Sequence, residues 1–197
     1  MAALIWSACS KSEIPKGGIE DPVFSMVIQP DSGDSAAFIA GQKGIYLFTN
    51  VEYGADKVLA MSGAFADASC PSGDCAGSVG FEFRNINSED FSEPSLIFGP
   101  GFLWLFKNPE LDPPFFRTVA IQWIQPGGKM LRSDIIQQPN FQDSSYFHVL
   151  SSEPWDLNEK GETTWKMNVE FSCWMFDSVL TKEQRIYGSG VIAVGYQ

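Results

Sequence analysis

The sequence contains a single histidine among 197 residues, which leaves little room for histidine-based catalysis or for a metal site built from several histidines. Basic residues are also scarce. Lys and Arg number 13 against 24 Asp and Glu, so the formal net charge is −11. Nucleic acids and anionic membrane surfaces both attract basic protein surfaces. The composition therefore argues against nucleic acid as a partner and against attraction to an anionic membrane.

Long apolar runs are missing as well. No stretch reaches the roughly 18 apolar residues that a membrane-spanning helix needs, so we expect no transmembrane span. No stretch shows a convincing helical stripe, although residues 178–184 are consistent with a single helical turn. The 16 Phe, 6 Trp and 5 Tyr favour strands over helices. The chain is thus expected to be rich in strands and poor in helix.

Alternation of apolar and polar residues with a period of two recurs along the chain and indicates half-buried strands. The clearest example is Thr164–Met175, where every second residue from Trp165 onward is apolar. Val79, Phe81 and Phe83 alternate in the same way. About ten short strands, with residues 102–106 among them, are separated by turn sequences rich in Gly, Pro, Asn and Asp. This pattern predicts a single antiparallel β-sandwich of jelly-roll type over residues 23–197.

The N-terminal residues suggest a cellular address. Ser7-Ala8-Cys9 follows an apolar stretch and precedes polar residues, as in a bacterial lipobox, where the cysteine becomes the acylated N-terminus. The apolar stretch is short and no basic region precedes it, so we expect either that the true start lies upstream or that the chain was trimmed. Residues 10–22 are polar and contain Pro and Gly, which is typical of a flexible tether. Residues 1–22 are therefore predicted to be a signal remnant and tether, the alternative being that Cys9 is an ordinary residue near the chain end.

Three further cysteines require an account. Cys70 and Cys75 flank a short loop of turn residues, and in a secreted protein such a pair is expected to form a disulfide. A zinc site is the competing interpretation, but only Cys173 and His148 could complete its four ligands. Cys173 lies on the apolar side of its strand, which favours a buried, inert thiol. We therefore predict a disulfide and neither a metal nor a cofactor.

Several segments together carry a resemblance. They are the lipobox-like start, residues 40–49 (AGQKGIYLFT), the cysteine pair ahead of residues 78–85 (SVGFEFRN), and the strands containing residues 171–173 and 190–194. In this general pattern the chain resembles the small uncharacterised surface lipoproteins of Bacteroidota. The resemblance implies a β-sandwich at the cell envelope, lipid-anchored at the outer membrane or cell surface. It carries over no catalytic residues.

Signals for catalysis are weak. His148 is the sole candidate base for a Ser-His-acid hydrolase, and no serine lies in a Gly-x-Ser-x-Gly elbow. Glu82 and Glu170 could be paired as the carboxylates of a glycoside hydrolase, but each also fits the polar side of a strand. Asp31 and Asp34 resemble a fragment of a calcium loop that lacks the remaining ligands. We therefore expect a protein that is not an enzyme.

Aromatic residues provide the main candidates for a contact surface, because Trp and Phe suit both sugar stacking and protein partners. The candidate residues are Phe102, Trp104, Phe106, Phe115, Phe116, Trp155 and Trp174. The leading hypothesis is a non-enzymatic envelope lipoprotein that acts as a surface binding or assembly module. Its partner would be an envelope protein, a glycan or a second copy of the chain. A carbohydrate-binding module is the alternative, and a glycoside hydrolase is a weaker one.

Overall fold

The structure, a computed structural model, describes residues 18–53, 58–84, 86, 93–102, 104–106, 117–135, 142, 144–158, 160–177 and 182–196. These residues form ten strands and one short helix. The elements are β1 (Ser25–Pro30), β2 (Ala36–Ile39), β3 (Ile45–Tyr53), β4 (Val58–Asp67), β5 (Ser78–Arg84), α1 (Pro94–Phe98), β6 (Thr118–Ile124), β7 (Met130–Arg132), β8 (Tyr146–Leu157), β9 (Thr163–Phe176) and β10 (Lys182–Gly195). The predicted all-β fold with about ten strands is confirmed.

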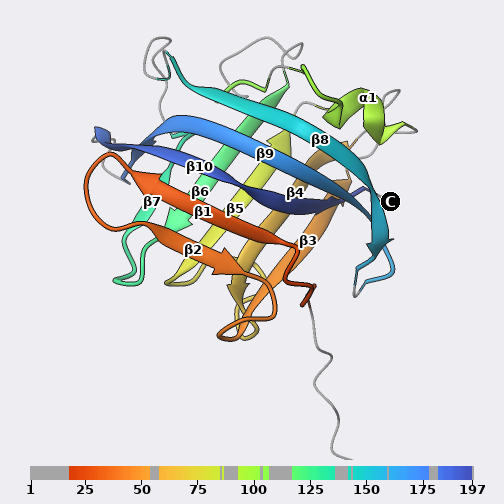
Figure 1. Ribbon diagram of the computed structural model, residues 1–197, viewed down its shortest axis with the longest axis horizontal. Coiled ribbons are helices and arrows are strands. Elements are labelled where there is room, and N and C mark those ends of the chain that lie inside the picture. The colour runs from red at the N-terminus through yellow and green to blue at the C-terminus, as the bar shows by residue number, and fades with distance from the viewer. Residues whose placement is uncertain are drawn as a thin grey trace, which may run out of the picture.

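The strands form one antiparallel sheet in the order β2-β1-β10-β9-β7-β6-β5-β4-β3, and β8 pairs with β9 beside that path. In Figure 1, β8, β9, β10, β1 and β2 run side by side across the front, and β3 to β6 cross behind them. β10 contacts both β3 and β4 as well as its sheet neighbours. The sheet therefore rolls up until it is nearly closed and barrel-like, with its two halves facing each other across the core.

The two halves approach each other closely where β4 crosses β10. A side chain at Gly63 would collide with the backbone carbonyl oxygen of Ala193 on β10. A side chain at Gly195, near the end of β10, would press against Val51 of β3. Only a residue without a Cβ allows one backbone to come so close to another. These glycines therefore permit the roll that brings the ends of the sheet together.

The core follows the predicted alternation. The inward-facing residues of β9 are all buried, and they are the ones predicted: Trp165, Met167, Val169, Phe171, Cys173 and Met175. Val79, Phe81 and Phe83 of β5 are likewise buried. Phe171 packs across its neighbour on β10, where Gly188 leaves room for the ring. The inner surface of the sheet is thus filled by large side chains, and Gly188 lies opposite one of them, Phe171.

A corner of the sheet forms where β9 changes its partner. β8 pairs with β9 as far as Ser172, and β7 pairs with it at Phe176. Between these points the Gln142 side chain takes the place of a strand. Its Oε1 accepts a hydrogen bond from the backbone N–H of Trp174 (3.0 Å), and its Nε2 donates to the Trp174 carbonyl (2.9 Å) and to the Ser133 carbonyl (2.7 Å). Gln142 thereby satisfies backbone groups that the diverging strands leave unpaired.

The β8–β9 turn reaches across to β3, an edge strand of the sheet. Asn158 in this turn is buried, and its Nδ2 donates to Thr49 Oγ1 (2.8 Å) on β3. Its Oδ1 accepts from the backbone N–H groups of Lys160 and Glu162 (2.9 and 2.8 Å). Ile19 also forms an isolated bridge with Leu47 of β3. The edge of β3 is therefore partly covered, which protects it from pairing with other chains.

Some elements differ from the sequence-based expectations. β8 extends to Leu157 because it is an edge strand, where Pro154 is tolerated and bulges absorb the irregularity. The predicted strand over 102–106 is limited to isolated bridges at Trp104 and Leu105. The helical turn expected up to residue 184 is wrong in its second half, because β10 already begins at Lys182. Helix α1 and strand β7 were not predicted, since five and three residues are too few to show a period.

The crossing at Gly63 yields a first prediction. Gly63→Ala should lower the free energy of unfolding by roughly 1–3 kcal/mol, because the added methyl group forces β4 and β10 apart. The measurement is urea unfolding followed by tryptophan fluorescence. Gly127→Ala in the β6–β7 turn is the matched control, because a Cβ there meets nothing within 4 Å. Equal unfolding midpoints for the two variants would show that the close crossing does not constrain the sheet.

Candidate functional site

Two of the predicted contact residues lie in the core. Trp104 is 1% and Phe106 4% exposed. The Trp104 ring packs edge-on against Phe83 (4.8 Å between ring centroids) and is stacked with Phe98 (5.5 Å). Trp104 also forms an isolated antiparallel β-bridge with Phe147 of β8. The side chains of Trp104 and Phe106 therefore point into the interior. Trp104 and Phe106 are therefore removed from the predicted contact surface.

Phe102 and Trp155, two further predicted contact residues, each lie against a cationic side chain. Phe102 is 38% exposed, with the Arg117 guanidinium 4.5 Å from its ring centroid, and it lines a small apolar pocket beside β8. Trp155 is half-buried between the Phe24 ring (5.4 Å) and the Lys166 ammonium (4.3 Å). Cys9, Phe115 and Phe116 lie outside the described residues. Phe102 and Trp155 thus pack against different neighbours, and these contacts do not join them into one surface.

Trp174 belongs to a more extended surface on the outside of β8, β9 and β10. The side chains that alternate away from the core place Trp174 opposite Arg185 on β10, and Tyr187 follows two residues further along. Trp174 is half-buried and Tyr187 is 46% exposed. Tyr146 and His148 occupy the corresponding outward positions of β8. We refer to Tyr146, His148, Trp174, Arg185 and Tyr187 as the outer aromatic face.

Arg185 occupies a distinctive position in this face. Its Nε donates to Ser172 Oγ (2.8 Å) and its Nη2 to the Ser144 carbonyl (2.6 Å). The guanidinium carbon lies 5.9 Å from the Trp174 ring centroid and 5.7 Å from that of Tyr187, within the range of cation–π attraction. Its described hydrogen-bond partners are neutral oxygens. The cation is thus fixed between two rings and its charge is not cancelled by a carboxylate in the described part of the chain.

His148 lies on the same face and not in the core. Its Nδ1 is 3.3 Å from Glu170 Oε1, and its ring stacks on Tyr146 at 4.7 Å. The two side chains of the His148–Glu170 pair are each about half exposed (49% and 45%). In the described residues no serine hydroxyl is hydrogen-bonded to His148. The arrangement can stack and hydrogen-bond a ligand, but it does not form the base–nucleophile contact that acyl transfer uses.

Arg185 and Tyr187 were missed by the sequence analysis. Residues 185–196 look apolar on both sides, because Gly188 and Gly190 interrupt the inward half of the alternation. The signal that could have revealed them was the alternation of the outward-facing residues Arg185, Tyr187 and Ser189. Treating the glycines as inward positions opposite large side chains would have restored the period of two.

The candidate glycoside hydrolase carboxylates do not form a site. Glu82 of β5 receives two hydrogen bonds from Arg84 (2.6 and 2.7 Å). Glu170 of β9 faces His148 instead. β5 and β9 are not neighbours in the sheet. Each carboxylate is therefore engaged by a local cation or a potential cation on its own strand or the next.

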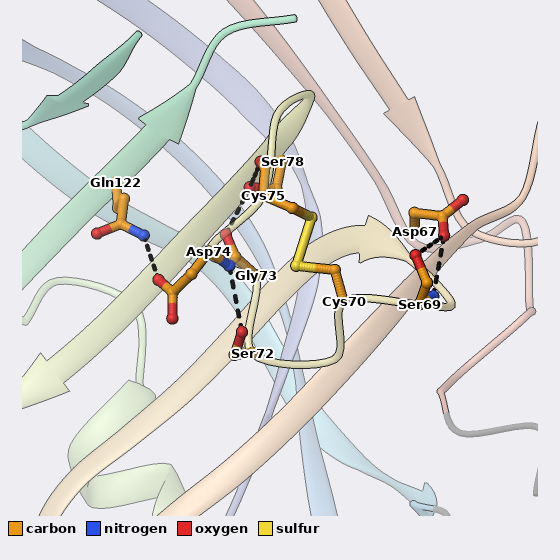
Figure 2. The surroundings of a disulfide bond; sticks show 9 residues. All are labelled: Asp67, Ser69, Cys70, Ser72, Gly73, Asp74, Cys75, Ser78 and Gln122. Atoms are coloured by element: carbon orange, nitrogen blue, oxygen red, sulfur yellow. Dashed lines mark hydrogen bonds between the residues drawn. A yellow bond between two sulfur atoms is a disulfide. The ribbon is translucent and has the colours of Figure 1, made fainter. Parts of the chain in front are cut away.

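Figure 2 shows the disulfide between Cys70 and Cys75, which closes the loop from β4 to β5 as predicted. Inside this loop the buried Ser78 hydroxyl contacts the carbonyl oxygens of Gly73 and Cys75. The Asp74 carboxylate accepts a hydrogen bond from Gln122 Nε2 (2.8 Å) on β6. The loop is thus held by one covalent bond and by contacts to two strands.

No group of three or more His, Cys, Asp or Glu side chains that could hold a metal ion occurs in the described residues. No helix among them is long and apolar enough to cross a membrane. No protein-family model, curated protein or solved structure matches this chain. The functional interpretation therefore rests on the chain's own residues.

Cys173 generates a second prediction. The thiol is fully buried, and this burial raises its pKa far above the usual range, so the reactive thiolate is not populated at neutral or mildly alkaline pH. In a Cys9→Ser variant, Ellman's reagent should therefore find no thiol in the folded protein at pH 7 or pH 9, and one thiol after unfolding in urea. Cys173→Ala should remove that signal. Rapid labelling of the folded Cys9→Ser protein that accelerates with pH would contradict the burial.

Proposed function

We propose that this protein is a non-enzymatic binding module of the cell envelope that contacts its partner through the outer aromatic face. The observation that carries the proposal is Arg185, fixed between Trp174 and Tyr187 with neutral oxygens as its described hydrogen-bond partners. Trp, Tyr and Arg are the residues most enriched at the energetic centres of protein interfaces. Their grouping on one exposed face supports a contact surface there.

Charge supports the same surface. The chain carries a formal net charge of −11, so most surface cations are expected to have an acidic residue nearby. Arg84 and Arg132 each have one: Arg84 is bound by Glu82, and Arg132 is bound by Asp134 (2.8 Å). Arg185 instead retains its charge toward solvent. A partner that offers a carboxylate or a carbonyl oxygen would gain a charge-assisted hydrogen bond at this point.

The cellular address remains a proposal drawn from the sequence. Ser7-Ala8-Cys9 and the resemblance to surface lipoproteins of Bacteroidota support secretion and a lipid anchor at Cys9. The Cys70–Cys75 disulfide agrees with an oxidising compartment. We also propose that the two facing halves of the rolled sheet act as the two layers of a jelly-roll-like sandwich. One layer would then present the outer aromatic face away from the core.

A glycan is a second candidate partner, favoured by the Tyr146–His148 stack. These rings lie next to Glu170, so an apolar platform and a hydrogen-bonding carboxylate are adjacent. Sugar recognition combines these two elements, because pyranose rings present both C–H faces and hydroxyl groups. Protein and glycan partners make different predictions for the experiment below.

Tyr187→Ala tests the contact surface. We expect at least about tenfold weaker binding of labelled protein to envelope fractions of the native host, as for loss of an interface anchor. Tyr53→Ala is the matched control, because Tyr53 is also exposed (57%) but lies on β3. Protease treatment of the fractions should abolish binding to a protein partner, and periodate oxidation should abolish binding to a glycan. Equal binding by both variants would exclude the outer aromatic face.

The anchor has a separate test. Protein expressed in the native host from its full reading frame should carry added acyl mass at Cys9, with everything before Cys9 removed, and should partition into the detergent phase. A Cys9→Ser variant should remain unacylated and move to the aqueous phase. An unmodified, water-soluble wild-type product would exclude lipid anchoring and leave the contact surface untouched.

A further inference from the structure

A cleft of about 450 Å³ lies on the other half of the molecule, on the outer side of β3 and β4. Two cross-strand pairs line it, Phe48 with Ala64 and Asn50 with Ser62. Pro71 and Ser72 of the disulfide loop, together with Lys160 of the β8–β9 turn, complete its lining. The volume falls in the range of small-molecule sites, which run from roughly 300 to 1,000 Å³.

Lys160 is held in place at this cleft by β3. Its ammonium donates to Asn50 Oδ1 (2.8 Å) and to the Thr49 carbonyl (3.3 Å). The turn that carries it is fixed by the buried Asn158, whose amide binds Thr49 Oγ1. An ammonium group has three donors, so one remains after these two bonds. A positive charge with a free donor is thus pre-positioned at the cleft.

The other polar groups that line the cleft also have donors to offer. The Ser62 hydroxyl makes no hydrogen bond within the described part of the chain. Ser72 Oγ accepts a long hydrogen bond from the Asp74 N–H (3.4 Å), which leaves its own proton available. The Asn50 amide uses its oxygen for Lys160 and retains its N–H groups. A set of donors around one cation is complementary to an oxyanion.

The disulfide shapes one side of the cleft. Cys70 and Cys75 enclose Pro71 and Ser72, and Figure 2 shows Ser72 at the outer bend of this loop. The Asp74 carboxylate of the same loop is bound by Gln122, and the described lining of the cleft includes no carboxylate. In a chain of net charge −11, a lining that holds a lysine and no described carboxylate favours a negatively charged ligand.

We propose that this cleft binds a small organic carboxylate and that the Cys70–Cys75 disulfide holds one of its walls. Lys160 would pair with the carboxylate, with the Ser62 and Ser72 hydroxyls as further donors. The apolar part of the ligand would lie against Phe48, Ala64 and Pro71. A single ammonium matches a singly charged carboxylate better than a phosphate dianion, which favours bidentate or multiple cationic partners. The carboxylate could belong to a free acid or to the C-terminus of a peptide.

The test is titration of the ¹⁵N-labelled protein with benzoate, followed by NMR. We expect shifts at the amides of Asn50, Ser62, Ser72 and Lys160, with a Kd on the order of 1 mM. Benzamide, the neutral isostere, should bind at least about tenfold more weakly. Binding of N-acetylphenylalanine is compared with binding of its amide to test whether a peptide C-terminus also fits the cleft. Shifts with benzoate alone assign the site to free acids, and shifts with both acids extend it to peptide termini.

Variants separate the ligand contact from a structural effect. Lys160→Met should weaken benzoate binding about tenfold or more, while Lys160→Arg should keep most of it. Ser62→Ala should weaken binding several-fold without touching the contacts of Lys160 to β3. Lys43→Met, at an exposed lysine in the β2–β3 turn, is the control and should bind as the wild type does.

The disulfide is tested by the double variant Cys70→Ser, Cys75→Ser, for which we expect benzoate binding several-fold weaker than in the wild type. Unchanged affinity would overturn the role given to the disulfide. Equal shifts with benzamide, equal competition by inorganic phosphate, or an unchanged Kd in Lys160→Met would overturn the carboxylate site. Tyr187→Ala lies on the other half of the sheet and should leave benzoate binding unchanged, so the two proposals fail separately.

Discussion

The close crossing of β4 and β10 at Gly63 is the constraint on which the rest of this structure depends. One continuous sheet can bury both of its ends only if it rolls until distant strands touch, and here they touch backbone to backbone at Gly63 and Ala193. Along the rest of the interior the halves are held apart by large side chains such as Phe65, Phe81 and Phe171. The two halves are therefore farther apart where these rings lie between them than at the crossing.

The sequence was sufficient to predict the strands that are long and alternate cleanly. Residues 164–175 show their inward face clearly, because each inward residue from Trp165 to Phe171 is apolar and is followed by a polar one. Trp104 and Phe106 could not be placed in this way. Their segment is crowded with aromatic residues, and only tertiary contacts with Phe83 and Phe147 decide that these side chains turn inward.

An obscured alternation in β10 explains why only part of the candidate site was predicted from the sequence. Trp174 was among the aromatic candidates, and it also stands out on the otherwise polar face of β9. Arg185 and Tyr187 were not, since Gly188 and Gly190 interrupt the inward apolar positions of β10 and obscure its period of two. The cleft of the disulfide loop was also invisible in the sequence. It is formed by β3, β4 and the β8–β9 turn, and Lys160 lies about 110 residues along the chain from its partner Asn50.

Lys160, Arg84 and Arg185 show how the placement of cations differs across an acidic protein. Arg84 is bound by Glu82 and also lies 3.4 Å from Asp134, so its charge is balanced by carboxylates within the fold. Arg185 and Lys160 are instead fixed by neutral oxygens. Such contacts orient a cation without cancelling its charge, which keeps a larger electrostatic gain available for an incoming anion. The positions of these two side chains are for this reason the most informative polar features of the surface.

The β8–β9 hairpin carries parts of both surfaces, which raises the question of whether they are coupled. His148 and Trp174 lie toward one end of the hairpin, and Lys160 lies in its turn at the other. Coupling between distant sites requires an element with two alternative arrangements. Asn158 opposes this, because its buried amide bonds to Thr49 and to both Lys160 and Glu162, and any other arrangement of the turn would leave these groups unpaired. The hairpin is thus a rigid support, and occupation of one surface is expected to leave the affinity of the other unchanged.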